Sequence, residues 1–98
     1  MILAEARSRI RRYTPEEAKA DPDLLLVDTR PADERERDGS IPGATHVPLS
    51  TLPWRTDALA GRRVCLVCAH GYSSSLAAAL LVELGVDAGD LIGGYEAW

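Results

Sequence analysis

Two short apolar runs constrain the fold of this chain more than any other feature. Residues 24–28 read LLLVD and residues 63–68 read RVCLVC, and turn-forming residues bound each run. A continuous apolar run of this length is typical of a strand that is buried on both faces of a parallel sheet. Parallel strands need crossover connections, so the two runs predict an α/β fold with a central, mainly parallel β-sheet flanked by helices on both faces.

Helical patterns lie on either side of these runs. The segment SSSLAAALLVELG at 73–85 predicts a helix with serine caps at its start and a glycine at its end. Thr14, Pro15 and Glu17 form a capping-box pattern, which predicts a second helix that ends near residue 21. The remaining expectations are a short amphipathic helix in an N-terminal extension at 1–10, a charged segment at 30–40 that is helical for at most two turns, a strand at 44–47, a loop with one helical turn at 50–61, and a strand and glycine turn at 90–98. The 98 residues suffice for one core, and we expect a single domain over 1–98.

Charge and hydropathy argue against two classes of partner. The chain has 15 acidic and 11 basic residues, and no stripe of basic residues is interleaved with aromatic ones. We therefore expect no nucleic-acid partner. The basic residues near the start lack the long apolar stretch of a signal peptide, and the apolar segment at 76–84 contains Glu83 and is too short to span a bilayer. We expect a cytoplasmic protein with no membrane contact.

Cys65 and Cys68 stand three residues apart, which raises the question of a redox pair or a metal site. Three residues of extended strand span about 10 Å, which is too far for a disulfide, and their side chains point to opposite faces of the sheet. A zinc site would need more ligands than Cys68, His70 and the distant His46 supply. We expect no metal, and we interpret Cys65 as a small buried apolar residue.

Cys68, in contrast, opens the loop CAHGYSS at 68–74, which leads into the predicted helix. Gly71 permits an unusual backbone angle, and the serines at 73–75 bring several backbone N–H groups toward the sulfur. The positive end of the helix dipole lowers the pKa of a nearby thiol. The pattern favours a nucleophilic Cys68 that attacks a group arriving or leaving as an anion.

Four motifs together carry a family resemblance. LLLVDTR at 24–30, GSIPGATHVP at 39–48, CAHGYSS at 68–74 and LIGGYEAW at 91–98 follow one another as in single-domain rhodaneses. The chain resembles this sulfurtransferase family from Ile10 to Trp98. The resemblance implies that catalytic Cys68 takes sulfane sulfur from a donor such as thiosulfate or a persulfide, holds it as a persulfide and passes it to a thiol or cyanide, without a metal or organic cofactor. The residues that we expect to cradle the persulfide and bind substrate are Ala69, His70, Gly71, Tyr72, Ser73 and Ser74.

Two positions depart from the family pattern. Many active members carry an arginine where this chain has Ser73, and a histidine often stands where it has Ser40. Serine brings no charge to an oxyanion, which weakens the case for thiosulfate and favours a persulfide or another protein as donor. Related phosphatases and arsenate reductases need an arginine where this chain has Ser74, so phosphatase chemistry is disfavoured.

Other polar residues near the loop have competing interpretations. We interpret Asp28 and Arg30 as an ion pair that fixes the neighbouring loops, structural rather than catalytic. His70 either tunes the thiolate or faces solvent, and Tyr72 either contacts an acceptor or packs; both alternatives stay open. His46, within a short strand, is interpreted as structural.

An alternative function is a rhodanese fold that does no chemistry and docks a partner protein. Ser73 in place of arginine motivates this alternative, and the acidic segment at 33–38, otherwise a solvated loop, would then select the partner. The retained cysteine in a glycine-bearing loop favours the enzyme.

Overall fold

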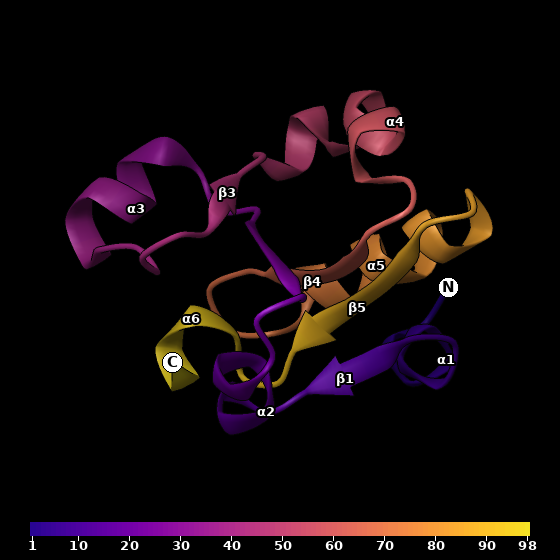
Figure 1. Ribbon diagram of the computed structural model, residues 1–98, viewed down its shortest axis with the longest axis horizontal. Coiled ribbons are helices and arrows are strands. Elements are labelled where there is room, and N and C mark those ends of the chain that lie inside the picture. Colours follow the sequence, from indigo (N-terminus) through magenta and orange to yellow (C-terminus); the bar gives the residue numbers. More distant parts are fainter.

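The computed structural model describes residues 1–98, and its centre is a five-stranded sheet in the order β1-β5-β4-β2-β3 (Figure 1). Every neighbouring pair of strands is parallel. The strands are β1 (Arg11–Tyr13), β2 (Leu25–Asp28), β3 (Thr45–His46), β4 (Arg63–Val67) and β5 (Asp87–Leu91). The predicted α/β fold is confirmed, and the two apolar runs form β2 and β4, which pair with each other.

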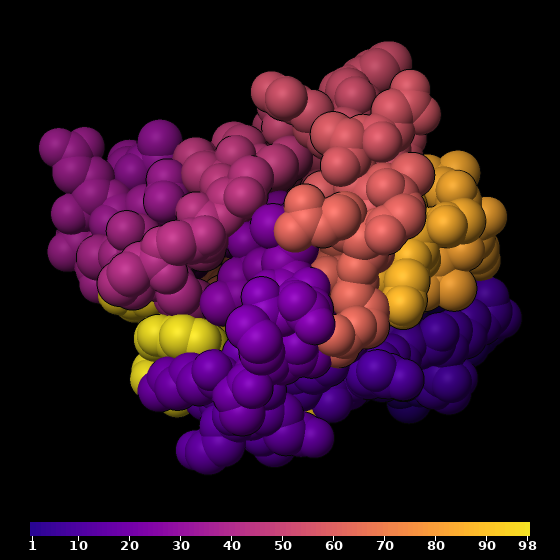
Figure 2. Space-filling view, viewed as in Figure 1, coloured from indigo at the N-terminus to yellow at the C-terminus, as the bar shows by residue number.

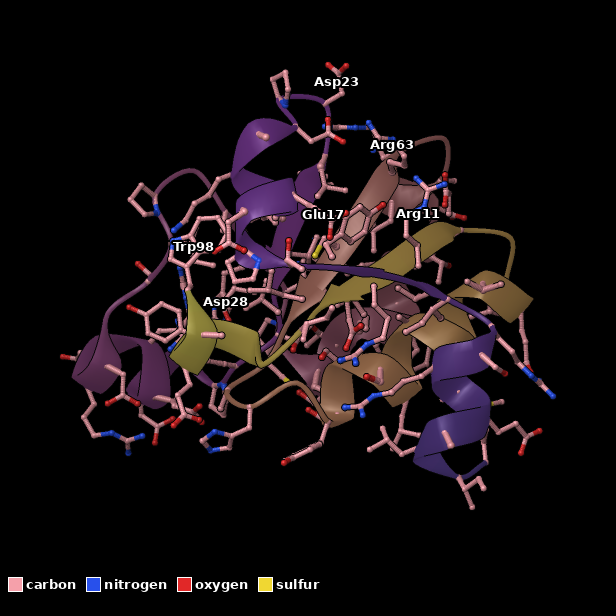
Figure 3. All side chains as sticks on the ribbon, turned by 90° about the horizontal axis from the view of Figure 1, so that it is seen from below. Arg11, Glu17, Asp23, Asp28, Arg63 and Trp98 are labelled. Carbon is pink, nitrogen blue, oxygen red and sulfur yellow. The ribbon has the colours of Figure 1, made fainter.

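Helices cover both faces of this sheet. They are α1 (Leu3–Ser8), α2 (Pro15–Ala20), α3 (Ala32–Asp38), the 3-10 helix η1 (Leu49–Arg55), α4 (Thr56–Leu59), α5 (Ser73–Glu83) and α6 (Gly94–Ala97). Figure 3 shows α2, which carries the labelled Glu17, on one side of the sheet, and α1 and α5 on the other. None of these helices has the length and apolar character needed to cross a membrane.

Buried side chains form one apolar cluster on each face. The cluster facing α5 includes Val64, Leu66, Ala78 and Leu81, and the cluster facing α2 includes Tyr13, Ala18, Cys65, Val67 and Leu91. Successive residues of β4 therefore alternate between the two clusters, as the two-residue period of a strand requires. Burial on both faces explains why β4 reads as a continuous apolar run.

Helix α2 begins at the capping box that the sequence predicts. The Thr14 hydroxyl accepts a hydrogen bond from the Glu17 N–H at 3.1 Å, and the Thr14 N–H donates to the Glu17 carboxylate at 2.9 Å. These two bonds satisfy backbone donors that the first turn of a helix leaves free. Helix α5 begins at Ser73, and the chain leaves it through Gly85 at a φ of 89°, as predicted. The predicted serine caps are wrong, because Tyr72 is the N-cap residue without a side-chain cap and the Ser74 and Ser75 hydroxyls bond Asp90 instead.

Several features differ from the sequence-based expectations. The segment at 50–61, expected to be a loop with one helical turn, is helical through Leu59, because the 3-10 helix η1 runs directly into α4. Strand β1 was not expected, because Arg11–Tyr13 is short and mostly polar and is extended through its pairing with β5 at the sheet edge. Helix α6 was not expected either, since a four-residue helix has little intrinsic stability and depends on tertiary contacts. Strand β4 ends at Val67, so Cys68 is the first residue beyond it rather than its last residue.

The carboxyl ends of the strands meet at one edge of the sheet. Asp28 ends β2, Cys68 follows β4, and Leu91 ends β5. The loops that leave these strands converge there, and in Figure 2 the C-terminal residues (yellow) lie between the segment around α3 (magenta) and the segment around α2 (purple). Ligands of parallel α/β sheets bind at this kind of edge.

Candidate active site around Cys68

Cys68 directly follows the central strand β4 and lines a cavity. The residue is 6% exposed, and it contributes to the lining of a cavity of about 460 Å³. The residues that line this Cys68 cavity are Thr29, Arg30, Pro31, Glu34, Pro48, Leu49, Ser50, Cys68, Ala69 and Ser73. A small ligand that enters the cavity can therefore reach the thiol without unfolding the loop.

The loop after Cys68 folds back over the sulfur and directs polar groups toward it. The N–H of Gly71 donates to Sγ at 3.1 Å and the N–H of Ser74 donates to it at 3.4 Å. The thiol donates in turn to the Ser74 hydroxyl oxygen at 3.1 Å. Gly71 has a φ of 87°, and a Cβ there would lie 2.9 Å from the Gly93 nitrogen, so the turn requires glycine. The loop supplies the inward N–H groups that its sequence predicts.

The surroundings set the two thiols apart chemically. Burial raises the pKa of Cys68, but hydrogen bonds with the Ser74 and Ser73 side chains and with the amides of Ser74 and Gly71 outweigh it and hold that pKa below its ordinary value. Burial, with the nearby Asp90 carboxylate, raises the pKa of Cys65 far above the ordinary range. A lower pKa gives Cys68 more thiolate near neutral pH, whereas Cys65 remains a protonated thiol.

The two cysteines do not form a pair. Both thiols are free, and Cys65 packs in the cluster facing α2, whereas the sulfur of Cys68 contacts Ser74 of α5 on the other face. This arrangement agrees with the opposite orientations predicted from their spacing. No group of three or more histidine, cysteine or acidic side chains gathers as a metal site requires.

Helix α6 holds the Cys68 loop from the other side, a contact that the sequence did not reveal. The N–H of Tyr95 donates to the Cys68 carbonyl at 2.7 Å, and the N–H of Glu96 donates to the Ala69 carbonyl at 3.1 Å. A Cβ on Gly94 would collide with the Cys68 carbonyl oxygen, so only glycine permits this approach. The paired glycines of LIGGYEAW were the available signal for a close backbone contact.

Asp28 and Arg30 form a buried ion pair beside the cavity. The Arg30 guanidinium donates to the two carboxylate oxygens at 3.1 and 2.8 Å and to the Gly39 carbonyl at 2.8 Å, and it lies 3.7 Å from the centre of the Tyr95 ring. Burial raises the pKa of Asp28, but hydrogen bonds and charge from Arg30, with charge from Arg35, lower it overall. The pair joins the loop after β2 to the loop before β3 and to α6, contacts that favour the structural interpretation of these residues.

The structure separates the predicted substrate-binding residues into groups. Ala69 and Ser73 line the Cys68 cavity, and Gly71 and Ser74 contact the sulfur directly. His70 and Tyr72 are not among the cavity-lining residues.

The histidines and Tyr72 have partners elsewhere. The exposed His70 ring is 2.7 Å from the Glu96 carboxylate. The Tyr72 side chain is exposed, and the Arg7 guanidinium lies 5.9 Å from its ring centre. The His46 ring is 2.7 Å from the Arg30 carbonyl, which favours its structural interpretation.

The fold and the site together define a parallel α/β protein with a buried cysteine just before the N-terminus of a helix, and the pKa of this cysteine is lowered. Residues 14–98 match the family model of the rhodanese-like domain. The chain therefore belongs to the rhodanese-like domain family. It is 31% identical over 84 residues to a Bacillus subtilis (strain 168) protein named "Putative sulfurtransferase YtwF", and the match covers 85% of this chain and 81% of that protein.

Two solved structures extend this similarity. A rhodanese homologue from the extremely thermophilic bacterium Thermus thermophilus is 36% identical, with a TM-score of 0.73 over 90% of this chain and 100% of that one. A Rhodopseudomonas palustris CGA009 protein of unknown function, described as a possible tyrosine phosphatase, is 30% identical, with a TM-score of 0.87 over 98% of this chain and 84% of that one.

Proposed function

We propose that this protein is a sulfurtransferase that carries sulfane sulfur on Cys68 as a persulfide. The observation that carries the proposal is the environment of the Cys68 sulfur. The sulfur accepts hydrogen bonds from the N–H groups of Gly71 and Ser74, the pKa of its thiol is lowered, and the residue lines a cavity. Family membership and the relative named a sulfurtransferase support the same chemistry. The proposed cycle needs only the thiol and the groups around it.

The cycle has two displacement steps. In the first, the Cys68 thiolate attacks the outer sulfur of the donor, a bond from Sγ to that sulfur forms, and the donor group leaves with the electron pair of the broken bond. In the second, a thiolate or cyanide attacks the outer sulfur, and the Cys68 thiolate leaves with its electron pair. Negative charge returns to Sγ in this step, where the N–H groups of Gly71 and Ser74 stabilise it.

The charges around the cavity disfavour a donor that carries two negative charges on one compact group. Arg30 is the one basic residue in the lining, and its guanidinium is already paired with the Asp28 carboxylate. Glu34 lines the same cavity and adds a negative charge, while Ser73 offers only a hydroxyl. A dianion such as thiosulfate therefore meets no free cation, so we propose a persulfide, on a small thiol or on a protein, as the preferred donor.

Phosphatase activity is not part of this proposal. A phosphate-binding loop of this family branch needs an arginine at the position that Ser74 occupies. The Ser74 side chain is fully buried and its hydroxyl bonds the Asp90 carboxylate, which repels phosphate. The description of the Rhodopseudomonas palustris relative therefore does not extend to this site.

A second candidate function is docking of a partner protein without catalysis. An apolar groove of about 350 Å³ adjoins the Cys68 cavity and shares Leu49 and Ser73 with it. Leu49, Leu76 and Leu80 are each more than two-fifths exposed, which is unusual for leucine side chains. This exposure is the observation that keeps the docking alternative open.

Intact mass measurement tests the proposal against this alternative. The wild type, Cys68→Ser and Cys65→Ala proteins are incubated in turn with thiosulfate and with glutathione persulfide, and their masses are read before and after reduction. We expect one reducible sulfur on the wild type and on Cys65→Ala, and none on Cys68→Ser. A folded wild type with a free thiol that gains no sulfur from either donor would instead favour docking.

A further inference from the structure

Asp90 is a buried acidic residue directly beneath the Cys68 loop, and the proposed cycle does not use it. It lies on β5, and its side chain is fully buried. The hydroxyls of Ser74 and Ser75 donate to its Oδ2 at 3.0 and 2.6 Å, and the Arg12 guanidinium donates to its Oδ1 at 2.9 Å. This carboxylate is ion-paired with Arg12 and lies one hydroxyl group away from the Cys68 sulfur.

The Ser74 hydroxyl links this carboxylate to the sulfur. Its oxygen is 3.1 Å from Cys68 Sγ and 3.0 Å from Asp90 Oδ2. The hydroxyl has a single proton, so it donates to one of these two acceptors at a time. When Cys68 is a thiol, the S–H donates to the Ser74 oxygen and the Ser74 O–H donates to Asp90. When Cys68 is a thiolate, no S–H is present and the Ser74 O–H turns to the sulfur.

Asp90 keeps other partners after this rotation. The Ser75 hydroxyl and the Arg12 guanidinium still donate to it, so the carboxylate is not left unsatisfied. The charged and titratable groups around the pair are Arg12 on β1, the Cys65 thiol on β4 and Arg7 on α1, which donates to the Ser75 oxygen at 3.2 Å. Since both ends of the link are buried, water screens their interaction weakly.

We propose that Ser74 and Asp90 form a proton-directed switch that sets the charge on the Cys68 sulfur. Asp90 is a positioning residue that draws the Ser74 proton away from Sγ and repels negative charge there, whereas Ser74 stabilises that charge when its proton turns to the sulfur. The role of the switch in sulfur transfer rests on the proposed function. In the loaded state the negative charge lies on the outer sulfur, Sγ is neutral, and the Ser74 proton returns to Asp90, so Asp90 favours the persulfide over the bare thiolate.

The two residues should act on the thiol in opposite directions. Asp90→Asn keeps the shape but removes the negative charge, frees the Ser74 proton for the sulfur and leaves the Arg12 cation nearby, and all three effects favour the thiolate. We expect about tenfold faster alkylation of Cys68 by iodoacetamide at pH 6, because the rate follows the thiolate fraction. Ser74→Ala removes the donor, so alkylation should be several-fold slower, and Ser74→Thr should restore it.

The experiment follows the alkylation rate of Cys68 against pH, with peptide mapping to separate it from Cys65 and with no sulfur donor present. Asp87→Asn is the matched control, because it removes the same charge from the exposed start of β5 and should leave the rate unchanged. In the Ser74→Ala background, Asp90→Asn should have a smaller effect than in the wild type. Unchanged or slower alkylation in Asp90→Asn, or equal rates in Ser74→Ala and Ser74→Thr, would overturn the switch.

This measurement is independent of the sulfur-loading experiment. A switch that titrates as expected in a protein that gains no sulfur would contradict the proposed function alone. Normal sulfur loading with an alkylation profile insensitive to Asp90 and Ser74 would contradict the switch alone.

Discussion

At the scale of single residues, neighbouring positions with similar chemistry have different roles because their partners differ. Cys65 and Cys68 are both buried, yet the first meets apolar side chains and the second meets two amides and a hydroxyl. The carboxylates of Asp28 and Asp90 are both fully buried, yet the first bonds guanidinium groups and the second also bonds serine hydroxyls. Burial therefore gives little information about reactivity until the polar partners are known.

Asp28 provides a residue-scale prediction for stability and pH. Its pKa is lowered in the folded state, so its ionisation stabilises the fold above the ordinary aspartate pKa, and this contribution is lost as pH falls through the folded value. Asp28→Asn leaves the buried Arg30 charge without its partner and should lower the free energy of unfolding at pH 7 by about 3 kcal/mol. Urea unfolding of both proteins at pH 7 and pH 3 measures the free energy of unfolding. The difference in this free energy between wild type and Asp28→Asn should be smaller at pH 3 than at pH 7.

The exposed pair of Arg37 and Asp38 offers a control for this prediction. Its two side chains are 69% and 43% exposed, so solvent weakens their attraction. Asp38→Asn should therefore change the urea midpoint much less than Asp28→Asn. Equal effects of the two substitutions would contradict the assignment of Asp28 as a buried structural anion.

At the scale of elements, the course of the Cys68 loop depends on two glycine positions, in addition to the side chains of Arg7 and Ser75 that bond the Gly71 carbonyl. Gly71 turns the chain so that its own N–H faces the sulfur, and Gly94 allows α6 to reach the Cys68 carbonyl. The loop is thus held between the start of α5 and the start of α6. Its geometry requires both glycines, one on each side.

Gly71→Ala tests this loop geometry. The left-handed φ of 87° and the close approach of the Gly93 nitrogen both oppose a side chain, so the turn must shift and withdraw its amide from Sγ. We expect sulfur loading at Cys68 to slow by at least about tenfold, as typically follows loss of one anion-stabilising donor. Loading reactions that are quenched at successive times and measured by intact mass give the rate of sulfur loading.

Gly61→Ala is the matched control for that substitution. Gly61 has a similar φ of 79°, lies in open space and is remote from the cavity lining. It should lower stability slightly and leave the loading rate as in wild type. Equal slowing in the two variants would mean that general strain, and not the amide of the loop, limits the reaction.

The elements also show how far the sequence alone can predict this structure. Strands β2 and β4 and helix α5 were predictable because they are continuous apolar or helix-forming runs with clear ends. Strand β1 and helix α6 were not, because β1 is polar at two of three positions and α6 is four residues long, so tertiary contacts decide both. The loop at 68–74 was also predictable, because its glycine and serines are a local sequence signal for a turn that leads into a helix.

Asp90 illustrates the part of the site that the sequence could not provide. It stands in the predicted final strand, 22 residues after Cys68, with no local pattern that connects it to the loop. Only the parallel pairing of β4 with β5 and the packing of α5 on the sheet bring it to Ser74. Contacts that depend on strand order are invisible to local sequence patterns.

At the scale of the whole molecule, the chain places the Cys68 sulfur at the edge where the parallel strands end, beside a cavity whose lining offers anions no free cation. The formal net charge is −4, and the guanidinium of Arg30 beside the cavity is neutralised by its partner. Long-range attraction therefore does not draw anions to the site. This distribution is the reason for proposing a persulfide donor over a dianion.

Ser73→Arg tests this charge argument. An arginine at the cavity wall would supply the free cation that the site lacks, and it would favour a compact dianion more than a donor whose charges are spread over a larger molecule. We expect kcat/KM for thiosulfate to rise by about tenfold, a gain typical of one charge-assisted contact, and the value for glutathione persulfide to change less. Ser73→Gln, similar in length but uncharged, is the control, and an equal rise with glutamine would contradict the electrostatic explanation.

The complete sulfur cycle is the most direct test of the account. Wild type and Cys68→Ser are loaded from a glutathione persulfide that carries isotopically labelled outer sulfur, freed of donor and mixed with cyanide or a thiol. We predict one labelled sulfur per wild-type chain, located on Cys68 by peptide mapping, and its transfer to the acceptor as the free thiol returns. Label that never reaches Cys68, or that reaches the acceptor equally well with Cys68→Ser, would contradict the central claim.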